Sequence, residues 1–301
     1  MRNILVMQTD FSLKSAAVSV MHGVSCQVDR DLVVEDISHE VAKWNPYAAS
    51  TNLAYTLPYW PEGTVFVSVI DPGVGTDRKA CVAKTKNGYY IVTPDNGTLT
   101  QIAKQYGIEE VRVIDETVNR YPGTEGINIF HGRDLFAFCG AKLASGKITF
   151  EEVGPAYDVS EIVIIDTPPA YVSDGVIHGF NMTCNANFGI NVSNIPVALL
   201  ENIDVKMGDM VRLSVTHNGK VHFDEKVLYH RSFGYVAPGE PICYNAEGML
   251  LGFALNLENF MERYGTQPGP DWLVTVEKAL TRPRCESIGA FLYISKAGFM
   301  Q

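Results

Sequence analysis

Apolar runs alternate with amphipathic stretches through the first half of the chain, and this alternation predicts strands interleaved with helices. The expected strands cover 4–8, 32–36, 64–70, 89–93 and 111–114. The expected helices cover 15–24, 46–56, 97–106 and 131–143, with Gly146 ending the last of them. Strands and helices that alternate at these spacings indicate βαβ units and a largely parallel sheet.

The pattern changes after about residue 150, where short β-like runs replace the alternation. Two proline-containing segments mark a linker, Gly154-Pro155 and Thr167-Pro168-Pro169, and 162–165 is an expected strand within it. Later strands are expected at 175–180, 210–216, 220–223, 241–244, 249–255 and 272–276, with Asn218-Gly219 favouring a tight hairpin. We therefore predict an α/β N-terminal domain with a mostly parallel sheet (1–156), followed by an all-β, barrel-like C-terminal domain (170–301).

Composition narrows the class of protein. A chain of 301 residues has room for two domains, and its 46 % hydrophobic and 19 % charged content is that of a globular protein. The net charge of −10 argues against non-specific nucleic-acid binding, because a phosphate backbone would be repelled. No stretch reaches the roughly 20 apolar residues of a membrane span. We expect neither nucleic acid nor membrane among the partners.

The spacing of the cysteines indicates the cellular compartment of the protein. Six are scattered along the chain, and none forms a Cys-x-x-Cys pair. Free thiols in a reducing compartment explain this better than disulfides or a metal site, and we expect a cytoplasmic protein. The apolar run at the start of the chain is also too short for a secretory signal.

A carboxylate, a glycine-rich bend and a guanidinium follow the apolar run 64–70. Asp71 and Arg78 flank this bend, in which Gly73 and Gly75 let the backbone approach a ligand closely. Ligands of open α/β sheets bind at the carboxyl ends of the strands, where we place this segment. The alternative is a surface ion pair across a loop. We favour a site, since charges at a buried strand end are costly unless they are paired or functional.

A second cluster, Phe130-His131-Gly132-Arg133-Asp134, opens the last expected helix of the first half. Histidine is the side chain best suited to proton transfer near neutral pH, although His131 could instead be a polar residue packed against the sheet. The other six histidines (His22, His39, His178, His217, His222 and His230) show no metal-ligand spacing, so we expect no metal site.

Further candidates lie outside these two clusters. Asp10 follows the first strand and could bind a ribose diol, or else act as the N-cap of the helix near Ser15. Trp44, Phe188 and Phe233 could stack on a flat base, although core packing is the commoner role of a single aromatic residue.

Four segments occur in a specific order: Asp10-Phe11, Val69-Ile70-Asp71-Pro72-Gly73-Val74-Gly75-Thr76, Thr93-Pro94-Asp95-Asn96-Gly97, and Phe130-His131-Gly132-Arg133-Asp134. Followed by a β-rich half containing Asn187-Phe188-Gly189, they resemble the S-adenosylmethionine (SAM) hydroxide adenosyltransferase family, which also includes the SAM-dependent fluorinase and chlorinase. The resemblance implies an α/β domain followed by a β-barrel. It also implies a homotrimer that holds the ligand between the first domain of one subunit and the second domain of its neighbour.

The resemblance also implies roles for single residues. Asp71, Arg78 and His131 correspond to an Asp-Arg-His triad that holds water or hydroxide for attack on the ribose C5′ of SAM. On the N-terminal side, Asp10 would bind the ribose diol, Trp44 would lie beside the sugar, and Phe130 and Gly132 would line the site. From the second domain, Phe188 and Phe233 would sandwich adenine, with Asn185 and Asn191 as further ligand contacts. SAM is the substrate of this reaction, and no cofactor is implied.

The chain departs from the family pattern at the methionine end of the ligand. Ser15 and Ala17 stand where an acid and a polar or aromatic residue are usual, and Asn185 stands where an acid meets the ammonium. Ala246-Glu247 replaces a Ser-x pair. We therefore expect hydrolysis of SAM, or of an adenosyl sulfonium with a different tail, to adenosine and methionine or the corresponding thioether.

Two other functions stay open at this point. One is a halide adenosyltransferase that forms 5′-chloroadenosine, for which Gly132 would leave space beside His131 for a large anion. The intact triad and the absence of the long fluorinase insertion before the strand at 89–93 favour water. The other is a non-catalytic protein that binds adenosyl ligands, suggested by the altered methionine end.

Overall fold

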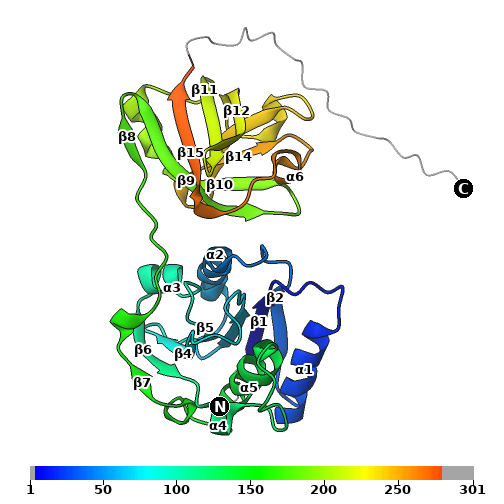
Figure 1. The fold of residues 1–301 in the computed structure, drawn as a ribbon. Coiled ribbons are helices and arrows are strands. Elements are labelled where there is room, and N and C mark those ends of the chain that lie inside the picture. Colours follow the sequence, from blue (N-terminus) through cyan, green and yellow to red (C-terminus); the bar gives the residue numbers. More distant parts are fainter. Residues whose placement is uncertain (1–3, 280–301) are drawn as a thin grey trace, which may run out of the picture.

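The computed structural model describes residues 4–279, which build two separate sheets (Figure 1). The first has the order β2-β1-β3-β5-β4-β6-β7. Its strands are β1 (Leu5–Thr9), β2 (Val34–Ser38), β3 (Val65–Val69), β4 (Ala80–Thr85), β5 (Tyr90–Pro94), β6 (Ile108–Val113) and β7 (Ala156–Tyr157). β2, β1, β3 and β5 are parallel, whereas β4 is antiparallel to both of its neighbours, β5 and β6. The predicted α/β fold with a parallel core is confirmed.

Helices cover both faces of this sheet. α1 (Ala17–Val28), a π-helical segment η2 (Gly132–Ala137) and α5 (Phe138–Ala144) pack on one face. α2 (Pro46–Thr56) and α3 (Thr100–Gln105) pack on the other, and the short α4 (Glu116–Asn119) lies near the sheet edge. Because both faces are covered, every residue of β3 is buried, as its largely apolar sequence requires.

The second sheet closes into a barrel. Its order is β10-β14-β13-β12-β11-β15-β9-β8, and a further pairing of β9 with β10 closes a ring of seven strands. The strands are β8 (Tyr171–Ser173), β9 (Val176–Asn185), β10 (Ile190–Pro196), β11 (Met210–His217), β12 (Lys220–Tyr229), β13 (Pro241–Ala246), β14 (Leu250–Leu255) and β15 (Gly269–Lys278). A short helix, α6 (Phe260–Tyr264), packs against the barrel core. This confirms the predicted barrel-like half, although residues 280–301 of the expected domain lie outside the described range.

The hairpin and the linker show where sequence patterns succeed and fail. Asn218 and Gly219 have φ values of 49° and 76° and join β11 to β12, as predicted. The strand expected at 162–165 is wrong, because this segment forms no strand. Its backbone amides bond to side chains instead: Val163 N donates to Asp95 Oδ1 (2.9 Å) and Ile165 N donates to Thr100 Oγ1 (3.0 Å). The sequence analysis also missed β4 and β10.

The two halves contact each other through α2. Asn45 caps this helix and also donates from Nδ2 to the carbonyl oxygen of Pro268, at 2.7 Å. Tyr47 packs edge-on against Phe180 of β9, with ring centroids 5.9 Å apart. Figure 1 shows α2 on the side of the α/β half that faces the barrel. No helix within residues 4–279 is long and apolar enough to cross a membrane.

Two helical glycines give a test of how closely α5 packs on the sheet. A Cβ at Gly140 would lie 2.6 Å from Cγ2 of Val67, whereas a Cβ at the exposed Gly23 of α1 meets nothing within 4 Å. We expect Gly23→Ala to raise the free energy of unfolding by about 0.5–1 kcal/mol through helix propensity. Gly140→Ala should lower it by about 1–3 kcal/mol through overpacking. Urea unfolding of both variants measures these changes in the free energy of unfolding. Equal stabilisation by the two substitutions would contradict the close approach of α5 to the sheet.

Candidate active site

Asp71 and Arg78 lie at the two ends of a loop that leaves β3 and enters β4. Gly75 has φ +77°, and a Cβ there would lie 2.8 Å from the carbonyl oxygen of Asn128, so the bend requires glycine. Asn96 Nδ2 donates to the carbonyl oxygen of Ile70 at 2.8 Å and fixes the strand end just before Asp71. The loop thereby turns Arg78 back onto Asp71.

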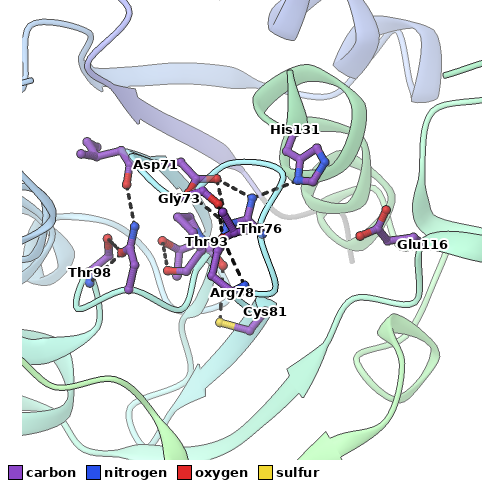
Figure 2. Close-up of polar contacts among 12 residues, drawn as sticks. Asp71, Gly73, Thr76, Arg78, Cys81, Thr93, Thr98, Glu116 and His131 are labelled. Atoms are coloured by element: carbon purple, nitrogen blue, oxygen red, sulfur yellow. Dashed lines mark hydrogen bonds and ion pairs between the residues drawn. The ribbon is translucent and has the colours of Figure 1, made fainter. Parts of the chain in front are cut away.

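Arg78 joins the two predicted clusters (Figure 2). Its Nε donates to both carboxylate oxygens of Asp71 at 3.0 Å, and its Nη2 donates to Oδ2 at 2.5 Å. The same Nη2 lies 2.9 Å from Nδ1 of His131. The Asp71 and Arg78 side chains are 5 % and 11 % exposed, and His131 is 6 % exposed. The structure therefore brings the three residues together, with the arginine in the middle.

A second arginine lies against the opposite nitrogen of the same ring. Arg120 Nη2 is 3.3 Å from His131 Nε2, and Arg120 also donates to Glu116 Oε2 from Nε (3.0 Å) and Nη2 (2.5 Å). Its Nη1 donates to the carbonyl oxygens of Thr124 and Ile127. Figure 2 shows Glu116 on the far side of the imidazole from Arg78. This pair was not predicted from the sequence, because its i, i+4 spacing is that of an ordinary helix ion pair.

The five side chains form one line, Asp71–Arg78–His131–Arg120–Glu116, in which each guanidinium lies between a carboxylate and the imidazole. Guanidinium groups only donate, and a neutral imidazole has one nitrogen that accepts and one that donates. The ring therefore accepts from one arginine only. The shorter contact assigns the lone pair to Nδ1, facing Arg78, and leaves Nε2–H beside Arg120.

These surroundings disfavour protonation of the ring. Burial is the main cause that lowers the pKa of His131, and the positive charges of Arg78 and Arg120 lower it further. Glu116 and Asp71 act in the opposite direction but more weakly. At neutral pH the imidazole is therefore uncharged.

Of the other predicted ligand residues, Asp10 and Trp44 lie together at the end of β1. Trp44 donates its backbone N–H to Asp10 Oδ2 at 2.9 Å, and its indole is 72 % exposed. The other oxygen of Asp10 has no hydrogen-bond partner within residues 4–279. The N-cap alternative for Asp10 is not observed, because α1 has no side-chain cap.

Phe130 and Gly132 flank His131. The Phe130 ring packs edge-on against Phe11 and lies beneath the Arg133 guanidinium. A Cβ at Gly132 would lie 2.9 Å from Cε2 of Phe11. The expectation of open space for a large anion beside Gly132 is therefore wrong, because the Phe11 ring fills it.

The predicted barrel residues lie apart from the triad in the chain. Phe188 is 66 % exposed, and Asn185 Oδ1 accepts the backbone N–H groups of Asn187 and Phe188. Phe233 packs against Tyr244, with centroids 4.9 Å apart. Asn191 is fully buried and bonds Asn181, Cys184 and Thr266, so the partners it has are structural. No hydrogen bond, ion pair or ring contact joins these four residues to the triad in the described part of the chain. Their roles stay predictions.

The motif residue Asp95 has a structural role. It is 5 % exposed and accepts a hydrogen bond from the Tyr157 hydroxyl at 2.9 Å, besides that from Val163 N. Asp95 thus holds the last strand of the first sheet and the start of the linker in place.

Two positions that depart from the family pattern, Asn185 and Glu247, line one cavity of about 650 Å³ between the halves. Tyr55 of α2 lines the same cavity, and the negative charge of Glu247 is the main cause that raises the pKa of its hydroxyl.

Comparisons with known proteins agree with this architecture. Residues 5–154 match the model of the SAM hydroxide adenosyltransferase N-terminal domain, and residues 187–273 match that of the C-terminal domain. An (R)-S-adenosyl-L-methionine hydrolase of Methanocaldococcus jannaschii is 30 % identical over 91 % of this chain and 95 % of its own length. A fluorinase of Actinoplanes is 24 % identical over 92 % and 98 %. A crystal structure of an uncharacterized conserved protein from Thermotoga maritima superposes with TM-score 0.75 at 31 % identity, covering 91 % of this chain and all of that one.

The opposite charges of Arg120 and Glu116 allow the effect of the surroundings on the pKa of His131 to be tested in both directions. Arg120→Gln removes a positive charge and should raise the pKa of His131, whereas Glu116→Gln removes a negative charge and should lower it. Titration of the His131 ring protons by NMR measures both values against the wild type. Shifts of the same sign in the two variants would contradict this line of charges.

Proposed function

The chain belongs to the SAM hydroxide adenosyltransferase family, and we propose that it hydrolyses SAM, or a closely related adenosyl sulfonium, to adenosine and L-methionine or the corresponding thioether. The observation that carries the proposal is the contact of Asp71, Arg78 and His131 at the carboxyl edge of the sheet. The reaction needs only water and the sulfonium, and we propose no cofactor.

The leaving group needs no acid catalyst. A water oxygen forms a bond to ribose C5′ while the C5′–S bond breaks. The electron pair of the broken C5′–S bond stays on sulfur. The cationic sulfonium thereby becomes a neutral thioether, and the proton lost by water is the only charge left to be accommodated. Catalytic help is therefore directed at the nucleophile.

We propose that this water enters between Arg78 and His131. We assign the lone pair of the ring to Nδ1, which Arg78 Nη2 contacts at 2.9 Å. A water in this gap would accept from the guanidinium and donate to Nδ1, while Asp71 holds Arg78 through three hydrogen bonds. Arg78 would then stabilise negative charge as it develops on the oxygen, and His131 would take the proton.

The ligand sites proposed around this water follow the family. Asp10, whose Oδ1 has no hydrogen-bond partner in the described part of the chain, would bind the ribose diol, and Trp44 would cover the sugar. Phe130 and Gly132 would line the pocket beside His131. Phe188 and Phe233 would enclose adenine, with Asn185 and Asn191 on the same side.

We further propose a homotrimer in which the barrel of a neighbouring subunit completes each site. Two observations support this. One is the large exposure of Trp44 and Phe188. The other is that, within residues 4–279, no hydrogen bond, ion pair or ring contact joins the triad to the four predicted barrel residues of the same chain. Aromatic residues are enriched at protein–protein interfaces relative to the rest of the surface.

The activity can be tested by incubating purified protein with SAM and measuring adenosine and methionine by chromatography. We expect adenosine from the wild type, and rates lower by about 10²- to 10⁴-fold for Asp71→Ala and His131→Ala. Arg212→Ala is the control, since it removes an exposed ion pair with Asp224 on the barrel and should leave the rate unchanged. Equal rates in all four proteins would remove the triad assignment.

The same assay separates the competing functions. 5′-Chloroadenosine formed only with chloride would indicate a halide transferase, and SAM binding without turnover would indicate a non-catalytic protein. The hydrolase relatives are named for the (R) form of SAM, so the assay compares both epimers at sulfur. Analogues lacking the ammonium or the carboxylate test the altered methionine end, and a strong preference for intact SAM would exclude a different tail.

Mixed subunits test whether two chains share a site. His131→Ala damages the triad side, and Phe188→Ala damages the adenine side. When both chains are co-expressed, random trimers should contain intact sites and regain about a quarter of the wild-type rate. Co-expression of His131→Ala with Asp71→Ala is the control and should regain nothing. A failure of the first pair to recover would place the site within one subunit.

A further inference from the structure

Three side chains that are separated in sequence meet beside the end of β1. His22 lies on α1, Asp36 on β2, and His39 just after β2. We refer to them as the His22–Asp36–His39 cluster. One ligand atom from each lies within 4.8 Å of the others, the only such group of three in the described part of the chain. Both Nε2 atoms lie close to the same oxygen, Asp36 Oδ1: His22 forms a hydrogen bond with it at 2.9 Å, and His39 lies 3.0 Å from it.

The geometry at His39 is unusual for an ion pair. Its side chain is 3 % exposed, and Nε2 is a buried polar atom without a hydrogen-bond partner among residues 4–279. The separation from Asp36 Oδ1 is short enough for a hydrogen bond, but the ring nitrogen does not point at that oxygen. The Nε2 of His39 is therefore oriented as a metal ligand would be, whereas the Nε2 of His22 would exchange its hydrogen bond to Asp36 for the ion.

A hydrogen bond at Nδ1 fixes the orientation of the His39 ring, as a metal site requires. Nδ1 lies 2.9 Å from the hydroxyl oxygen of Thr9. When Nδ1–H donates to this hydroxyl, the lone pair of Nε2 is directed into the cluster. Histidine ligands commonly donate their second N–H to such an outer partner, which fixes the tautomer and the orientation of the ring.

We propose that the His22–Asp36–His39 cluster binds a first-row divalent cation, with Zn²⁺ the best match. Two imidazoles and one carboxylate are a common zinc donor set, whereas Mg²⁺ and Ca²⁺ prefer oxygen ligands. The side chains of His22 and Asp36 are 33 % and 34 % exposed, so water has access to complete the coordination.

The ion would act as a clamp beside the candidate active site, whether or not SAM is the substrate. It would tie α1 to β2 and to the segment after it, which already receives a hydrogen bond from Ser12 N to the carbonyl oxygen of His39 (2.7 Å). Thr9, the partner of His39, directly precedes Asp10. The role we assign to the metal is to hold the loops that carry Asp10 and Trp44.

The test uses the full chain without a histidine tag, stripped with a chelator and then equilibrated with Zn²⁺. Mass spectrometry of the metal should give about one zinc per chain, and Co²⁺ in place of zinc should give a visible absorption band. Loss of a residue that only hydrogen-bonds to a metal ligand typically weakens metal binding by roughly 10- to 100-fold, and we expect this of Thr9→Val. His22→Ala and Asp36→Asn each remove a proposed ligand and should weaken zinc binding by more than this.

His217→Ala is the matched control. His217 Nε2 forms an exposed pair with Asp271 Oδ2 at 2.8 Å, without the third ligand, and its loss should leave zinc binding unchanged. Circular dichroism verifies that each variant is folded. Stoichiometry far below one in the wild type would overturn the proposal. Binding that survives in folded His22→Ala and Asp36→Asn would overturn it as well.

Discussion

The candidate site depends on the pairing of charge along the line Asp71–Arg78–His131–Arg120–Glu116. Buried charges carry a large desolvation penalty unless each one is compensated, and removal of one partner leaves the next unpaired. Here two carboxylates balance two guanidiniums, and the imidazole between them stays neutral. The loop after β3, α4 and the start of η2 must therefore be placed correctly at the same time.

The antiparallel strand β4 makes this placement possible. In an all-parallel sheet the residue before the next strand would lie at the amino edge, away from the ligand crevice. Because β4 runs against β5, its first residues lie beside the end of β5, where Asp95 N donates to the carbonyl oxygen of Lys79 at 2.8 Å. Arg78 consequently lies at the carboxyl edge with Asp71. One reversed strand thus brings both ends of a single loop to the same site.

The sequence was sufficient for features that are local or that follow a simple period. Such features were predicted from the sequence: the parallel core, the barrel, the Asn218-Gly219 hairpin and the two clusters around Asp71 and His131. Arg120 was not, because its i, i+4 pair with Glu116 gives no sign that the guanidinium faces a buried ring. His22, Asp36 and His39 were missed for a similar reason: their proximity arises only when α1 packs beside β2. The strand expected at 162–165 failed because buried side chains, not a neighbouring strand, satisfy its amides.

In the proposed reaction, the low proton affinity of His131 restricts how water can be activated. Water has a pKa near 15.7 and an unperturbed histidine about 6.5, so full transfer before attack would cost about 12 kcal/mol. The pKa of His131 is lower still, which makes early transfer costlier. As the C5′–O bond forms, however, the oxygen becomes strongly acidic, and a weak base suffices to remove the proton. In this proposal the line of charges therefore serves best by positioning the water and stabilising its oxygen, with proton transfer late in the reaction.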